Sequence, residues 1–138
     1  MRKKYVFIAI GIVLLCVIGW GFYKFNQPHT SAANKKPDQS IDAPALYAAF
    51  EKSEADANKI FMDKILEVKG TIAGVENSGK NITITLKGND VAGVSCSMAN
   101  DQKLIQIPIP GSAITIKGKC VGFLADVTLT DCVIQSTK

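Results

Sequence analysis

The sequence has little of what catalysis and metal binding require. Its only histidine, His29, lies in a polar stretch punctuated by prolines, where a solvated side chain is the usual role. No CxxC pair is present, whereas a structural zinc site takes four nitrogen or sulfur ligands at closer spacings. Residues 42–138 also contain no nucleophile motif accompanied by its base. We therefore expect a protein that is not an enzyme and that holds no metal and no cofactor.

Aromatic side chains are also scarce, since Phe123 is the only one between residues 68 and 138. Proteins that grip single-stranded nucleic acid stack bases on aromatic side chains, each base contributing about 1–3 kcal/mol. The net charge of +4 belongs to the front of the chain. Residues 1–41 carry six basic and one acidic side chain, and residues 42–138 carry ten lysines and eleven acidic side chains. Both features disfavour nucleic acid as the ligand.

One long apolar run is present, because residues 5–23 contain no charged side chain. A helix of that length measures about 28 Å, close to the hydrocarbon thickness of a bilayer. Arg2, Lys3 and Lys4 precede the run and only Lys24 follows it at once, so the positive-inside rule keeps the amino terminus in the cytoplasm. We expect residues 1–25 to form an uncleaved, single-pass signal anchor in the cell membrane, with the carboxy-terminal domain extracytoplasmic, in the periplasm or at the cell surface.

Two alternatives remain for the amino terminus. A cleaved signal peptide is possible, because the small residues 31–33 suit a signal peptidase, although the apolar run exceeds the usual core of about 7–15 residues. Cys16 resembles a lipoprotein acceptor, but Leu15 stands where that processing requires a small residue. The anchor and the cleaved signal both export the domain.

Residues 26–41 are polar and lack apolar periodicity, which predicts a flexible linker. The domain then spans residues 42–138. Its first part predicts one helix, with Asp42 as N-cap and Pro44 in the first turn. Leu46, Phe50 and Phe61 recur at helical spacing, and we expect that stripe to pack on the rest of the domain.

After Asp63 the apolar period changes from 3.6 to 2, which indicates strands. Strands are predicted at residues 68–75, 81–87, 91–98, 113–121 and 126–135. Two of them form a first hairpin, a third follows, and a long connection with two prolines leads to a final hairpin. This order predicts a mainly β fold, a five-stranded OB-fold barrel preceded by an α-helix.

The same residues resemble a known family. LYAAFEKSEADANKIFMDK, VKGTIAGV, GVSCSM, ITIKGKCVGF and DVTLTDCVI occur in order, and together they are similar to the tRNA-anticodon-like OB-fold family of small exported or membrane-anchored bacterial proteins. The resemblance covers roughly residues 45–134. It implies the OB-fold and an exported domain, and it brings no catalytic residues.

Cys96, Cys120 and Cys132 are disulfide candidates, since an oxidising compartment favours a bridge. Closing a loop of about 15 residues contributes about 3 kcal/mol in the chain-entropy model. Cys132 faces inward only if a β-bulge near Thr130 reverses the phase of the last strand. The sequence leaves open whether Cys132 pairs with Cys120 or with Cys96, and we expect the third thiol to be buried.

We therefore expect a non-catalytic, membrane-anchored binding domain whose ligand is a protein partner or an oligosaccharide of the cell envelope. Single-stranded nucleic acid is the alternative ligand, and thiol exchange with an envelope partner is a second alternative. The ligand is expected on the barrel face built from the first three strands and the loops around it. The candidate side chains for the ligand face are Lys69, Lys80, Thr83, Thr85, Lys87, Lys117, Lys119 and Phe123.

Overall fold

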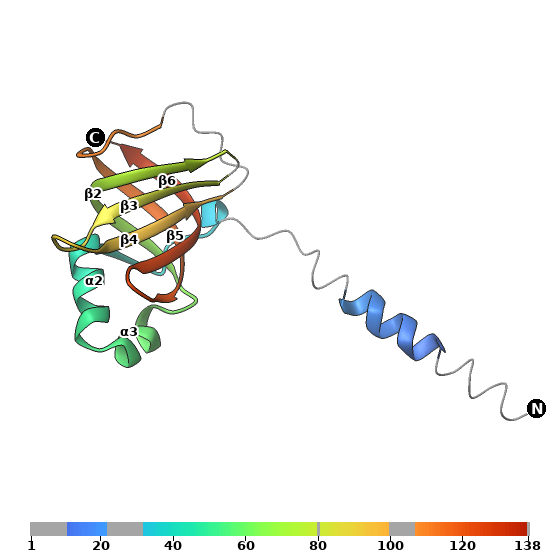
Figure 1. The fold of residues 1–138 in the computed structure, drawn as a ribbon. Coiled ribbons are helices and arrows are strands. Elements are labelled where there is room, and N and C mark those ends of the chain that lie inside the picture. The colour runs from blue at the N-terminus through green and yellow to red at the C-terminus, as the bar shows by residue number, and fades with distance from the viewer. Residues whose placement is uncertain (1–10, 22–31, 80, 100–106, 138) are drawn as a thin grey trace, which may run out of the picture.

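Six strands form one sheet that closes on itself in this computed structural model, which describes residues 11–21, 32–79, 81–99 and 107–137 (Figure 1). The strands are β1 (Gln39–Asp42), β2 (Ile65–Ser78), β3 (Asn81–Lys87), β4 (Gly93–Met98), β5 (Ala113–Phe123) and β6 (Val127–Thr137). Their order is β1-β2-β3-β4-β6-β5, and a further pairing between β2 and β5 closes a five-stranded barrel of β2 to β6, to which β1 adds along β2. The mainly β, five-stranded barrel with a helix before it is therefore confirmed.

Alternating burial explains why these segments form barrel strands. In β3, Ile84 and Leu86 are buried while Asn81 and Lys87 are exposed, as a half-buried strand requires. β2 is longer than predicted and bends, so that its first half pairs with β5 and its second half with β3. A register shift at Ala73 accompanies the bend. One long coiled strand thus contributes to both sides of the barrel.

The predicted bulge in the last strand is confirmed. β4 and β6 are parallel neighbours, and their register moves from Cys96 opposite Leu129 to Met98 opposite Cys132. Asp131 has φ of 52°, which is left-handed backbone and unusual for a residue with a side chain. The extra residue lets both Leu129 and Cys132 face the core, where each is fully buried.

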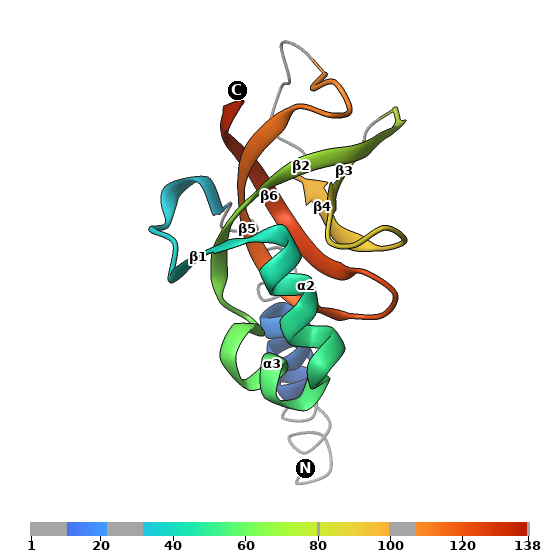
Figure 2. The same ribbon diagram turned by 90° about the vertical axis from the view of Figure 1, so that its left-hand side faces the viewer.

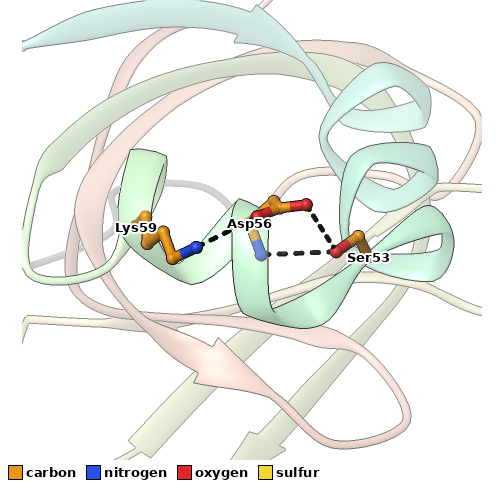
Figure 3. A network of polar contacts seen from close by, with 3 residues as sticks. All are labelled: Ser53, Asp56 and Lys59. Carbon is orange, nitrogen blue, oxygen red and sulfur yellow. Dashed lines mark hydrogen bonds and ion pairs between the residues drawn. The ribbon is translucent and has the colours of Figure 1, made fainter.

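The predicted single helix is two helices, α2 (Ala43–Lys52) and α3 (Glu54–Phe61). Ser53 between them has extended backbone and caps α3, since its Oγ accepts a hydrogen bond from the Asp56 N–H at 3.4 Å (Figure 3). The same hydroxyl donates to the Asp56 carboxylate at 2.9 Å, and Lys59 Nζ lies 3.2 Å from the other carboxylate oxygen. The apolar stripe continues after the break, since Ala57 and Phe61 of α3 are buried.

α2 covers one end of the barrel, and α3 lies beyond it (Figure 2). The core-facing side chains of α2 are buried, with Leu46 and Phe50 among the largest fully buried groups of the described residues. They join the inward side chains of β2, β3, β4, β5 and β6 in one cluster. The apolar side of α2 therefore closes one end of the barrel core, and its stripe packs on the domain as expected.

Part of the stretch predicted as a linker carries structure. A short 3-10 helix, η1 (Ala32–Asn34), is followed by β1, which pairs in parallel with the first half of β2. The Asp38 N–H donates to the Ile65 carbonyl at 2.7 Å, and the Asp38 carboxylate accepts from the Ile65 N–H at 2.8 Å. Backbone pairing of this kind needs no apolar alternation, so the sequence pattern does not reveal it.

The predicted anchor is described only over residues 11–21, which are helical and whose side chains from Ile12 onward are exposed. Residues 1–10 and 22–25 of that prediction lie outside the described residues. Over the ranges that the structure describes, no helix is both long enough and apolar enough to cross a membrane.

Candidate ligand-binding face

A hollow of about 600 Å³ lies on the outer face of the barrel, where β1 and β3 meet β2. On that edge of β2, the pairing with β1 ends at Lys69 and the pairing with β3 begins at Ile72. Gly70 and Thr71 therefore have no partner there in either strand. We call this feature the β2 hollow, and its lining residues are Asp42, Pro44, Lys69, Gly70, Thr71, Lys87, Ala113, Ile114, Thr115 and Ser136.

Polar side chains cross the β2 hollow in a row. Asp42 of β1 pairs with Lys69 of β2, Lys69 pairs with Thr115 of β5, and Thr115 pairs with Ser136 of β6. Directly opposed residues of neighbouring strands carry side chains on the same face, about 5 Å apart. The row thus presents a carboxylate, an ammonium group and two hydroxyls to one ligand.

A second hollow of about 230 Å³ lies beside the first and shares Lys87 with it. We call it the loop hollow, and its lining residues are Ala73, Thr85, Lys87, Asn89, Asp90, Val91, Ala92 and Asp126. The Asn89 side chain accepts hydrogen bonds from the Val91 and Ala92 N–H groups at 2.9 and 2.7 Å. Asp126 accepts from the Gly93 N–H at 2.7 Å, which ties the β5–β6 turn to the β3–β4 turn.

Comparison of the chain with known protein families gives a match to the tRNA_anti-like family over residues 1–134. The chain belongs to the tRNA_anti-like family. The resemblance seen in the ordered strand motifs is thereby confirmed. Comparison with curated proteins gives no match.

The tRNA_anti-like barrel is an OB-fold binding domain. OB-folds take oligonucleotides and oligosaccharides on the face of their second and third strands and between the neighbouring loops. Those strands are β3 and β4 here, and the loop hollow lies at the edge of that face. The β2 hollow lies next to it, over β1, β2, β5 and β6.

The barrel brings three of the predicted ligand-face residues together. Lys69 and Lys87 line the β2 hollow, and Thr85 and Lys87 line the loop hollow. Thr83 is half-buried and lies two residues before Thr85 on the same strand, lining neither hollow. Lys80 lies outside the described residues.

Three other predicted ligand-face residues are placed elsewhere. Phe123 packs against two aromatic side chains of α2, with its ring 5.7 Å from that of Phe50 and 5.8 Å from that of Tyr47. Lys117 is only 6% exposed, because η1 and the residues after it cover β5, and its Nζ donates to the Lys35 carbonyl at 2.9 Å. Lys119 forms an ion pair with Asp63 at 2.9 Å. None of the three contributes to either hollow.

Sequence reasoning missed four polar residues of the β2 hollow, namely Asp42, Thr71, Thr115 and Ser136. The alternation of β5 predicts that Thr115 faces outward. The sequence does not predict that Thr115 lies near Asp42, because the position of Asp42 depends on β1, which has no alternating pattern. Long-range pairing therefore assembles this hollow.

The three cysteines of the barrel are fully buried thiols in this structure, so it contains no disulfide between them. The side chains of Cys96 and Cys132 hydrogen-bond each other, and this bond together with burial raises the pKa of the Cys132 thiol. Burial also raises the pKa of the Cys120 thiol. Because the thiolate is the reactive form, these surroundings oppose thiol exchange.

Metal binding finds no support in the described part of the chain. Within it, no group of three or more His, Cys, Asp or Glu side chains comes together as ligands. The two hollows offer hydroxyl, amide, carboxylate and ammonium groups set among apolar atoms.

Proposed function

We propose that this protein is a membrane-anchored, extracytoplasmic binding domain, non-catalytic, which holds an oligosaccharide of the cell envelope against the outer face of β2 and β3. The observation that carries the proposal is the pair of adjoining hollows that share Lys87. Two adjoining hollows of about 600 and 230 Å³ suit an extended polar chain better than a single small molecule. A protein partner is the other ligand class that the sequence favours, and the experiment below separates the two.

The chemistry of the lining supports a sugar ligand. Hydroxyls of Thr71, Thr85 and Thr115 both donate and accept hydrogen bonds, and the exposed amide of Asn89 adds its own donors. Carboxylates accept from sugar hydroxyls and ammonium groups donate to sugar oxygens. A ligand with many hydroxyls satisfies such a mixed lining.

Single-stranded nucleic acid fits the same lining poorly. No lining residue of either hollow is aromatic, and Phe123 is packed against Phe50. The two hollows together contain three aspartates and two lysines, whereas a strand-binding groove is positive. Base stacking and backbone attraction are therefore both weak here.

The amino-terminal segment supports anchoring. Residues 5–23 are without charge and follow three basic residues, and the helix at residues 11–21 exposes apolar side chains such as Leu15 and Trp20. Exposed apolar surface of this kind is costly in water and favourable in a bilayer. Protease added to intact cells or spheroplasts tests the location. Digestion of the barrel supports export, and its survival places the barrel inside.

Binding is tested by NMR titration of the full-length, isotope-labelled chain in detergent micelles. The probes are neutral and acidic tetrasaccharides and a short oligothymidylate at low salt. We expect the tetrasaccharides to shift the amide resonances of Thr85 and Asn89. Thr85→Val should weaken that binding, and Thr128→Val is the matched control because Thr128 lines neither hollow.

Two results would contradict the proposal. Shifts from oligothymidylate alone, weakening steeply as salt rises, would point to nucleic acid. If no sugar shifted any amide resonance and residue 85 cross-linked the barrel to one envelope protein, the ligand would be a protein partner.

A further inference from the structure

We infer that the β2 hollow is a subsite for an oxyanion carried on a sugar, a carboxylate or a phosphate, which the ammonium groups of Lys69 and Lys87 hold. This inference rests on the proposed function and names the chemistry of one end of its ligand. It concerns the region over β2 and β5, beside the β3–β4 face.

The hollow arises from the path of β2. β1 and β3 both pair with the same edge of β2 and leave a gap at Gly70 and Thr71. A Cβ on Gly70 would lie 2.9 Å from the Ala43 Cβ, so the start of α2 closes tightly against the base of the gap. Ala113, opposite Thr71, is small. The gap therefore remains open to a ligand group on the outer side only.

The ends of β1 and β3 place charged residues on either side of this gap. Asp42 ends β1 and Lys87 ends β3, while Lys69 points outward from β2 beside Asp42. The β2 hollow thus contains two ammonium groups and one carboxylate. Its positive excess contrasts with the loop hollow, where Lys87 meets Asp90 and Asp126.

The two ammonium groups are available to a ligand. Among the described residues, Lys87 takes part in no ion pair. Lys69 has only a long contact of 4.0 Å with Glu67, and its side chain is 56% exposed. Glu67 in turn accepts a hydrogen bond from Ser40 at 3.0 Å. An oxyanion between Lys69 and Lys87 would gain charge-assisted hydrogen bonds that the protein itself leaves unmade.

The remaining lining groups suit the sugar that carries the oxyanion. Asp42 makes no capping hydrogen bond to α2, so its carboxylate is available to accept from a sugar hydroxyl. Thr115 and Ser136 continue the row on the far side of Lys69. A free inorganic anion would use the lysines alone, whereas an acidic sugar uses the lysines, the carboxylate and the hydroxyls together.

The test uses the full-length chain in detergent micelles and matched probes. One probe is a tetrasaccharide of glucuronic acid, and the second is the same tetrasaccharide with its carboxyl groups reduced. The third is glucose 6-phosphate, and the fourth is inorganic phosphate. We expect the acidic tetrasaccharide to bind at least tenfold more tightly than its reduced form. Lys87→Gln and Lys69→Gln should each lower the affinity for the acidic probe roughly tenfold, as loss of a charge-assisted hydrogen bond predicts. Their affinity for the reduced probe should stay within about twofold of the parent.

Lys52→Gln is the matched control, because Lys52 is exposed at the other end of α2. Thermal unfolding of each variant checks that the fold is kept. Specific, lysine-dependent binding of glucose 6-phosphate but not of the carboxylate probe would support the subsite with phosphate as its oxyanion.

Equal binding of the acidic and reduced tetrasaccharides without lysine-dependent binding of glucose 6-phosphate would overturn this inference and leave the proposed function standing. Full affinity in both lysine variants would do the same. Inorganic phosphate binding as tightly as the acidic sugars would also overturn it, because the sugar would then add nothing. Failure of every sugar probe would overturn the proposed function, and this inference with it.

Discussion

The buried thiols have a measurable effect on stability at the scale of single residues. The pKa of Cys120 and that of Cys132 are both raised in the folded barrel. The unfolded chain releases these protons near pH 8.5, while the folded state keeps them. The stabilisation is therefore complete below that pH and is lost as the pH rises toward the folded-state pKa values. For reduced protein, we expect the free energy of unfolding to fall above about pH 8.5, by at most about 1.4 kcal/mol per pH unit for each thiol.

Urea unfolding at a series of pH values between 7 and 10, on the order of one pH unit apart, measures this fall with a reducing agent present. Cys120→Ala and Cys132→Ala each remove one titrating thiol, so each should make the curve shallower. An unchanged slope in both variants would assign the fall to other groups, such as lysines.

The same geometry selects one disulfide from the alternatives that the sequence leaves open. Cys120 pairs with Leu129, and Cys132 lies three residues further along β6, so an offset along the strand adds to the strand spacing of about 5 Å and places the Cα atoms of Cys120 and Cys132 about 8 Å apart. A disulfide needs Cα atoms within about 7 Å, which excludes that pair. Cys96 and Cys132 are on neighbouring strands and their side chains touch.

Refolding of the reduced, denatured chain with oxidised glutathione should therefore give a Cys96–Cys132 bridge. In the exchange, each bridge formed reduces one glutathione disulfide to two thiols. Alkylation after denaturation, followed by peptide mass spectrometry, should find Cys120 modified, as well as Cys16, and should find Cys96 and Cys132 protected. A bridge that contains Cys120 in the major product would contradict this prediction.

At the scale of elements, Ser53 makes two helices from one apolar stripe. Its hydroxyl accepts from the Asp56 N–H and donates to the Asp56 carboxylate. The Lys59–Asp56 ion pair nearby is well exposed and contributes little. Loss of an N-cap hydroxyl typically costs about 1 kcal/mol. We expect Ser53→Ala to lower the free energy of unfolding by about that amount, as measured by urea unfolding.

Ser53→Asn is the conservative partner of that variant, because asparagine caps helices as well as serine does. It should retain most of the stability. Equal losses in the alanine and asparagine variants would mean that the hydroxyl acts by some route other than capping.

Elements also differ in how far the sequence predicts them. The strands of the barrel follow from alternation, and the bulge follows from the change of phase between Leu129 and Cys132. The register that assembles the β2 hollow does not, since β1 contributes backbone hydrogen bonds rather than an apolar pattern. The burial of Lys117 has the same origin, because the segment that covers it is polar and lies 82 residues away. Local periodicity therefore predicts the barrel, and long-range backbone pairing determines its binding face.

At the scale of the whole molecule, the stability of the barrel depends on α2, which closes one end of its core. The Phe50 ring is stacked on that of Phe123 at 5.7 Å and lies 6.0 Å from that of Phe61, and so links both helices to the end of β5. Removing a buried phenylalanine typically costs about 3–5 kcal/mol, against a total stability of about 5–15 kcal/mol for a domain. Phe50→Ala should therefore lose a large part of the stability, with the loss appearing as a lower urea midpoint.

Ile60→Ala is the matched control on α3. It also removes a large apolar side chain, but Ile60 is 46% exposed. It should cost less than about 1 kcal/mol. If α2 were only an appendage, Phe50→Ala would melt the helices and leave the strand amides protected in hydrogen exchange. Because α2 contacts β2, β3, β4 and β6, we expect helices and strands instead to lose protection together, as one cooperative unit.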